Sequence, residues 1–157
     1  MRKLRLILVT ASVAALMASL AAPALALMPP GNNGTIKIDG RPFDEAPDNE
    51  PHVNCGLQVD FYGFEMGDYT ATLTFELIAP TAGGTDFVTS VFVGEDAAGG
   101  GTDLDAQKTV NLRGWLANSG VTPHPIQGYH VKLTTNTPFS LGADVKHKVF
   151  WIQGCAS

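Results

Sequence analysis

The two cysteines are the residues of this chain with the best-defined chemistry. Cys55 and Cys155 are the only cysteines among 157 residues, and in an exported protein an isolated pair reads most simply as one disulfide. Such a bond closes a loop of about 100 residues, which is worth up to about 4.7 kcal/mol in the chain-entropy model. Two free buried thiols are the alternative.

Carboxylates around a glycine-rich loop could gather calcium, whose oxygen coordination is adaptable. The candidates are Glu95, Asp96, Asp103 and Asp105, which flank the run Gly99-Gly100-Gly101. Their spacing departs from the EF-hand pattern, because a third ligand, a glycine and a distal glutamate do not follow. A solvated surface loop is the alternative. The same ambiguity applies to a second acidic stretch, which contains Asp39, Asp44, Glu45, Asp48 and Glu50.

The four histidines are scattered along the sequence. A zinc or copper site needs three or four ligands that converge. His52 precedes the first cysteine, His124 falls in a loop, and His130 falls on the predicted outer face of a strand. His147 has the spacing of an inward-facing residue between two valines. We therefore expect hydrogen-bonded histidines and no metal centre.

The common catalytic motifs are missing from the sequence. It contains no G-x-S-x-G, H-E-x-x-H, C-x-x-C, G-x-x-x-x-G-K or G-x-G-x-x-G pattern, and these patterns mark many hydrolases and nucleotide-binding enzymes. We therefore predict a protein that is not an enzyme and needs no cofactor. The alternative is an enzyme whose catalytic residues lie far apart in the sequence and come together only in the folded protein.

The first 26 residues have the order of a secretory signal peptide. Arg2, Lys3 and Arg5 precede a run without charge that reaches Met28, and Ala24-Leu25-Ala26 offers a cleavage site. We expect a signal peptide over 1–26, a linker over 27–33 and one domain over 34–157. The alternative is an uncleaved membrane anchor, since the apolar run is long enough to span a bilayer.

Charge excludes some classes of partner. Removal of the three basic residues of the signal takes the formal net charge from −5 to −8. An acidic protein of this kind repels phosphate backbones and anionic lipid surfaces. We expect no nucleic-acid partner and no membrane contact after cleavage.

Apolar residues alternate with polar ones along several segments, as in strands with one buried face. In the clearest of them Val53, Cys55, Leu57, Val59 and Phe61 face inward. The run 87–93 alternates less, which is consistent with cover on both faces. The predicted strands are 34–39, 53–61, 69–77, 87–93, 108–116, 129–135 and 145–155.

The orientation of the last predicted strand determines which of its apolar side chains would be exposed in a surface patch. Val145, His147, Val149, Trp151 and Cys155 share one face of it, opposite Lys146 and Lys148. This alternation predicts that the valines and the cysteine point inward. Phe150 and Ile152 then point outward, and together with Tyr62 and Phe64 they could form an exposed patch that recruits a partner. The alternative is that a bulge or the acidic stretch covers them.

These strands, with turn signals between them and no helical period, predict an all-β fold. We expect an immunoglobulin-like antiparallel β-sandwich of about seven strands with one disulfide. The pattern departs from true immunoglobulin domains, because the second cysteine lies on the last strand and no early strand carries a tryptophan. A jelly roll or a small barrel is the alternative.

Several segments together resemble a known group of proteins. They are GTIKIDGRPFDEAPDNEPHVNC, QVDFYGF, the loop from GED to GGG, QGYHVKLTTNTP and GADVKHKVFWIQGC. Over nearly the whole mature chain they are similar to small, uncharacterised secreted proteins of actinobacteria. Some of those continue into a stalk with an LPxTG wall-anchoring signal, and this chain departs from them by ending at Ala156-Ser157. The resemblance implies a location and no activity.

These observations predict a secreted, non-enzymatic protein of the bacterial cell envelope or exterior. We expect an interaction or adhesion module with an unidentified envelope or extracellular partner. The alternative is an extracellular module that binds calcium or a small ligand through one of the two acidic segments.

Overall fold

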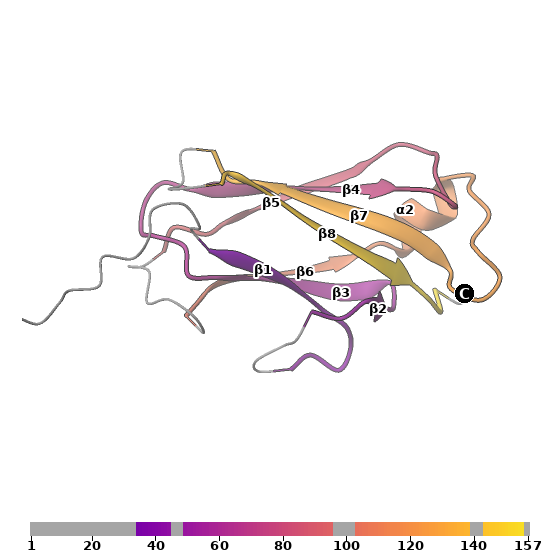
Figure 1. Cartoon of the computed structure of the whole chain (residues 1–157), viewed down its shortest axis with the longest axis horizontal. Coiled ribbons are helices and arrows are strands. Elements are labelled where there is room, and N and C mark those ends of the chain that lie inside the picture. Colours follow the sequence, from indigo (N-terminus) through magenta and orange to yellow (C-terminus); the bar gives the residue numbers. More distant parts are fainter. Residues whose placement is uncertain (1–33, 45–48, 96–102, 139–142, 156–157) are drawn as a thin grey trace, which may run out of the picture.

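The computed structural model describes residues 34–44, 49–95, 103–138 and 143–155. The expected signal peptide and linker lie outside these ranges. The described chain folds into two β-sheets that face each other, with one short helix at the end of the molecule where β8 ends (Figure 1). The prediction of an all-β sandwich is confirmed.

The smaller sheet has three strands in the order β1-β3-β6, and both neighbouring pairs are antiparallel. Its strands are β1 (Thr35–Asp39), β3 (Gly56–Tyr62) and β6 (Leu104–Asn111). The register shifts between Phe61 and Tyr62, where the pairing of β3 with β6 is irregular.

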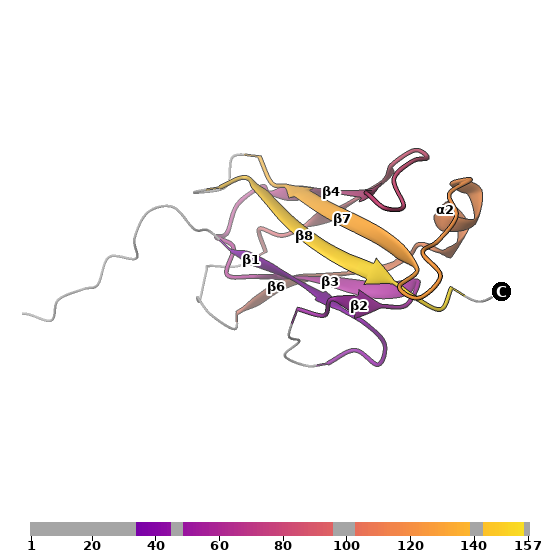
Figure 2. The same ribbon diagram turned by 45° about the vertical axis from the view of Figure 1, so that its right-hand side comes forward.

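The larger sheet has five strands in the order β2-β8-β7-β4-β5. The short strand β2 runs parallel to β8 and lies beside its end in both views (Figures 1 and 2), whereas all other neighbours are antiparallel. These strands are β2 (His52–Val53), β4 (Thr70–Leu77), β5 (Phe87–Phe92), β7 (Tyr129–Asn136) and β8 (Val145–Ile152).

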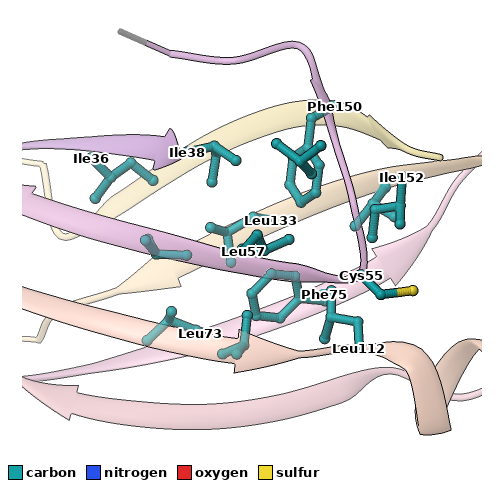
Figure 3. Close-up of a cluster of buried hydrophobic side chains, with 14 of the residues drawn as sticks. Ile36, Ile38, Cys55, Leu57, Leu73, Phe75, Leu112, Leu133, Phe150 and Ile152 are labelled. Carbon is teal, nitrogen blue, oxygen red and sulfur yellow. The ribbon is translucent and has the colours of Figure 1, made fainter. Parts of the chain in front are cut away.

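The core fills the space between the two sheets (Figure 3). Each sheet turns one face of its alternating strands toward the other, and in β4 burial follows the period of two expected for a half-buried strand. Strand β3 is the exception, because the residues of both its faces are buried. The largest fully buried side chains include Phe61, Phe64, Phe75, Phe150, Ile36, Ile38, Leu57, Leu73, Leu112, Leu133 and Ile152.

The predicted strand 53–61 is two strands in different sheets. Val53 ends β2 in the five-stranded sheet, and Gly56 begins β3 in the three-stranded sheet. The chain crosses between the sheets at Asn54 and Cys55, where Asn54 Oδ1 accepts a hydrogen bond from the backbone N–H of Gly56 at 3.0 Å. Alternation continued through the crossing because residues on both sides of it point into the same core.

The predicted orientation of β8 is wrong. Phe150 and Ile152 are each 1% exposed and lie in the core, whereas Val145 and Val149 are exposed. Pairing with β7 explains this, because Phe150 lies opposite the buried Val131. Lys146 and Lys148 therefore have the inward orientation.

Two strand boundaries and the burial of one strand also differ from expectation. The predicted strand 108–116 ends at Asn111 and is followed by the helix α2 (Arg113–Asn118), whose Leu116 joins the core. Strand β6 begins at Leu104, inside the stretch expected to be loop. Strand β5 is not covered on both faces, because Val88 and Phe92 are exposed.

No helix within the described part of the chain is long and apolar enough to cross a membrane.

Candidate functional site

The two cysteines form the expected disulfide. Cys55 and Cys155 are bonded, with their Cα atoms 5.3 Å apart. Cys55 is buried at the crossing between the sheets, and Cys155 lies just after β8, partly buried against the core. The bond therefore joins the beginning of β3 to the segment that follows the last strand.

The calcium candidates around the glycine-rich loop do not form a ligand group among the described residues. Asp96 lies outside the described ranges, and Glu95 is exposed. Asp105 is buried and its Oδ2 accepts a hydrogen bond from the backbone N–H of Phe64 at 2.8 Å. The backbone carbonyl of Asp103 accepts one from Gly63. Asp105 therefore has a structural role in holding the segment after β3.

The second acidic stretch does bring carboxylates together. Asp39 ends β1, and Asp44 and Glu50 belong to the segment that connects β1 with β2. One carboxylate oxygen from each of the three lies within 4.8 Å of those of the others. Glu45 and Asp48, the remaining candidates of this stretch, lie outside the described ranges.

Backbone hydrogen bonds hold these carboxylates in place. The N–H of Asp44 donates to Asp39 Oδ2 at 3.0 Å, and the N–H of Gly40 donates to Glu50 Oε2 at 2.9 Å. The N–H of Glu50 donates to the carbonyl of Ile38. A Cβ at position 40 would collide with Glu50 Oε2, so a side chain there would displace the Glu50 carboxylate from its present position.

Asp39 is buried at unusual electrostatic cost. Its side chain is 0% exposed, and its Oδ1 has no hydrogen-bond partner in the described ranges of the chain. Burial raises the pKa of the Asp39 carboxyl above its usual value, the hydrogen bond from Asp44 lowers it, and the charges of Asp44 and Glu50 raise it. Two like charges about 4 Å apart repel by about 4 kcal/mol at an effective dielectric constant near 20. No basic side chain of the described residues forms a salt bridge with these carboxylates.

Three of the four histidines lie near Trp151, which is on the outer face of the five-stranded sheet. The ring of His130 stacks on Trp151 with centroids 4.2 Å apart, and His124 meets the same ring edge-on at 5.9 Å. His130 Nδ1 lies 2.6 Å from the carbonyl of Ala79. His52 is exposed in β2, opposite Trp151. These contacts make His130 and His124 packing partners of Trp151.

His147 lies on the outer face and not in the core. Its Nδ1 is 3.0 Å from Thr134 Oγ1 on the neighbouring strand. The correction has the same cause as that of Phe150, since the whole of β8 has the opposite orientation to the one expected.

The predicted apolar patch does not exist. Tyr62 and Phe64 are buried, as are Phe150 and Ile152. The exposed large apolar side chains of the five-stranded sheet are on its two outermost long strands instead. They are Val88 and Phe92 in β5, and Val145 and Val149 in β8.

Strand β5 has an open edge. Its register with β4 places Val91 opposite Ala71, and Val93 donates a backbone hydrogen bond to Tyr69 at 2.9 Å. Bonded and non-bonded pairs alternate in antiparallel sheets, so the N–H and C=O groups of Val88, Ser90 and Phe92 point away from β4. None of these groups hydrogen-bonds to another part of the described chain.

Edge strands expose unpaired backbone groups, and most proteins protect them with charges, prolines or bulges. Strand β8 carries the inward-oriented Lys146 and Lys148, and β1 and β6 carry Lys37 and Lys108. Strand β5 reads FVTSVF and has neither a charge nor a proline. This uncharged composition is visible in the sequence, but alternation of apolar and polar residues does not reveal it.

Open pockets lie near the disulfide. One, of about 470 Å³, is lined by Arg41, Asn54, Thr109, Asn111 and Arg113 among others, and another by Pro123, His124, Ile126, Tyr129 and Gln153 among others. Neither lining places a serine or threonine beside a histidine, which is the pairing of nucleophile and general base in serine-type hydrolases.

Comparisons with protein-family models, with curated proteins and with solved structures find no match to this chain.

Proposed function

We propose that this chain is an exported, non-enzymatic interaction module of the cell envelope or exterior, and that its copies join through the open edge of β5. Export is supported by the order of charged and apolar residues in 1–26 and by the disulfide, since such bonds persist in oxidising compartments. The resemblance to secreted actinobacterial proteins points to the same location.

The order of the strands supports an immunoglobulin-like sandwich. In such domains strands A, B and E pair in one sheet and strands G, F and C in the other, with C′ beside C in the variable type. Assigning β1, β3 and β6 to A, B and E, and β8, β7, β4 and β5 to G, F, C and C′, reproduces both orders. Architectures of this kind serve many functions, so the proposal depends on the β5 edge.

The observation that carries the proposal is the self-complementarity of β5. The outward backbone groups belong to Val88, Ser90 and Phe92, which are evenly spaced around Ser90. A two-fold axis at Ser90, perpendicular to the sheet, places Val88 of one copy opposite Phe92 of the other and Ser90 opposite its own copy. All three residue pairs then exchange backbone hydrogen bonds in antiparallel register.

The same axis covers the exposed apolar side chains. Val88 and Phe92 are 57% and 48% exposed on the outer face of the sheet. In the proposed pair each packs against the other across the two copies, and such pairs of aromatic and β-branched residues contribute about 0.2–1 kcal/mol each. The strand carries no charge, so an acidic chain can meet its own copy here without direct repulsion.

The test is sedimentation equilibrium of the processed protein over a concentration series. We expect a monomer–dimer equilibrium in the wild type. Ser90→Pro removes an outward N–H without removing a hydrogen bond to β4, and we expect it to stay monomeric. Val88→Lys, which places a charge against Phe92 of the other copy, should do the same.

Val149→Lys is the matched control. Val149 is 48% exposed on the same face, but it belongs to β8 at the other side of the sheet, so this variant should associate like the wild type. Circular dichroism would establish that all variants are folded. A monomeric wild type would overturn the pairing of copies, even if the β5 edge captured a different envelope protein.

A further inference from the structure

We propose that Asp39, Asp44 and Glu50 bind a divalent cation, and that the cation is calcium. Two independent observations carry this inference. The three carboxylates converge within 4.8 Å, and the buried Asp39 has an oxygen, Oδ1, that no donor among the described residues satisfies.

The hydrogen bonds of the segment orient the carboxylates without using all of their oxygens. Asp39 and Glu50 each accept a backbone hydrogen bond on one oxygen, Oδ2 and Oε2 respectively. Each therefore keeps a second oxygen for a ligand. Asp44 is exposed, so water can complete the coordination from its side.

The chemistry of the donors selects the cation. All three donors are carboxylate oxygens, which suit hard cations and not the softer metals that bind histidine and cysteine. Calcium accepts an irregular arrangement of six to eight oxygens, whereas magnesium demands a near-ideal octahedron. Sites in extracellular modules typically bind calcium with dissociation constants of about 10⁻⁴–10⁻³ M, which is the range we expect here.

A bound cation would remove the electrostatic cost of the cluster. Buried polar groups in proteins are normally satisfied, and in the described residues neither a donor for Asp39 Oδ1 nor a basic side chain in a salt bridge with the cluster is found. A cation supplies both, because it coordinates the oxygen and neutralises the repulsion. A bound cation would also link the end of β1 to the start of β2, because Asp39 ends β1 and Glu50 lies just before β2.

The test combines calorimetric titration of the processed protein with calcium chloride and thermal unfolding in calcium or in EDTA. A ligand that binds only the folded state raises the midpoint, by roughly 5 °C when calcium is at about ten times its dissociation constant. We expect Asp44→Asn and Glu50→Gln to abolish both the heat of binding and the shift. Asp39→Asn should also lose the calcium response, while it folds without calcium at least as well as the wild type.

Glu95→Gln and Asp103→Asn are the control variants, because they remove carboxylates of the other acidic segment. They should keep the full response to calcium. A wild type that shows neither heat nor a shift at millimolar calcium would overturn the inference, and so would a full response in Asp44→Asn combined with Glu50→Gln. The monomeric Ser90→Pro variant should still respond, which separates this result from the association through β5.

Discussion

Asp60 shows how a carboxylate can be buried on the outer face of a sheet. It lies in β3, the central strand of the three-stranded sheet, and is 0% exposed. Gln58 Nε2 donates to Asp60 Oδ1 at 2.9 Å, and Gln58 Oε1 accepts from Thr109 at 3.2 Å. Asp60 Oδ2 has no partner among the described residues. The cost of removing water from one of its two oxygens is therefore not offset by a hydrogen bond within the described residues.

Burial raises the pKa of Asp60, while the neighbouring side-chain amides of Gln107 and Gln58 lower it and the charge of Asp39 raises it. A raised pKa means that the folded protein binds the proton more tightly than the unfolded chain. The ionised carboxyl therefore destabilises the fold at neutral pH, and this penalty disappears as the pH falls below the usual value of 3.8.

We predict that Asp60→Asn raises the free energy of unfolding at pH 7, by about 1 kcal/mol. The gain should shrink as the pH falls toward 4, because the wild-type carboxyl then becomes neutral as well. Urea denaturation at a series of pH values measures this difference. Asp68→Asn, which changes an exposed carboxylate, is the control. A gain that does not depend on pH would contradict the assignment.

Single residues were predictable where their chemistry was local. Pairing of Cys55 with Cys155 followed from their number and the exported context. The convergence of Asp39 with Glu50 could not follow from spacing, because it depends on the hydrogen bond from Gly40 that turns Glu50 back to the end of β1. The burial of Asp39, which distinguishes this cluster from solvated acidic residues, likewise depends on tertiary packing.

Strand β8 is an edge strand over most of its length, since β2 pairs only with Trp151 and Ile152. Its inward-oriented lysines are partly buried, and burial lowers the pKa of both Lys146 and Lys148. Inward-pointing charges on an edge prevent a second sheet from docking there. The two lysines thus lower the stability of the fold somewhat, and they also keep the β8 edge from pairing with another strand.

We predict that Lys148→Leu stabilises the monomer by about 1 kcal/mol, because an apolar side chain replaces a partly desolvated charge. The same change should promote association through β8, since the edge loses a protecting charge. Urea denaturation and sedimentation measure the two effects. Lys132→Leu is the control, because Lys132 lies on the outer face, where it pairs with Glu76 at 3.4 Å. A less stable Lys148→Leu variant would contradict this account.

Strands were predictable where one face is fully buried. Strands β4 and β7 follow their alternation, because both have neighbours on each side in the five-stranded sheet. The orientation of β8 was not predictable from alternation, because its valines lie on the outer face and its lysines are oriented inward. The helix α2 was missed because it is only six residues long, too short for a helical period to emerge.

At the scale of the whole molecule, the disulfide joins residues 100 positions apart in the sequence. All strands from β3 to β8 lie inside the loop that it closes. Cross-linking restricts the unfolded chain more strongly as the loop grows. The sandwich itself was predictable from alternation, but the crossing at Cys55 and the parallel pairing of β2 with β8 arise only when the two sheets pack together.

We predict that replacing Cys55 and Cys155 by alanine lowers the free energy of unfolding by about 3–5 kcal/mol. Equilibrium denaturation in urea measures the loss, and reduction of the wild type should reproduce it. The alanine variant and the reduced wild type should both retain the β-sheet signal in circular dichroism, because the core between the sheets remains. An unchanged midpoint would contradict the role assigned to the bond.

The position of the disulfide also decides how the domain would carry mechanical load. Strand β1 begins at one end of the sandwich, whereas β8, which ends three residues before Cys155, ends at the other (Figure 1). A force pulling these ends apart would pass from Cys155 directly to Cys55, so β3 to β8 would bear no tension. The segment from Gly34 to Cys55 could extend to a total length of about 70 Å at full stretch. An oxidised copy would therefore extend only a short distance under load, because the disulfide keeps β3 to β8 from being stretched. Reduction would allow the whole domain to unfold and extend much further.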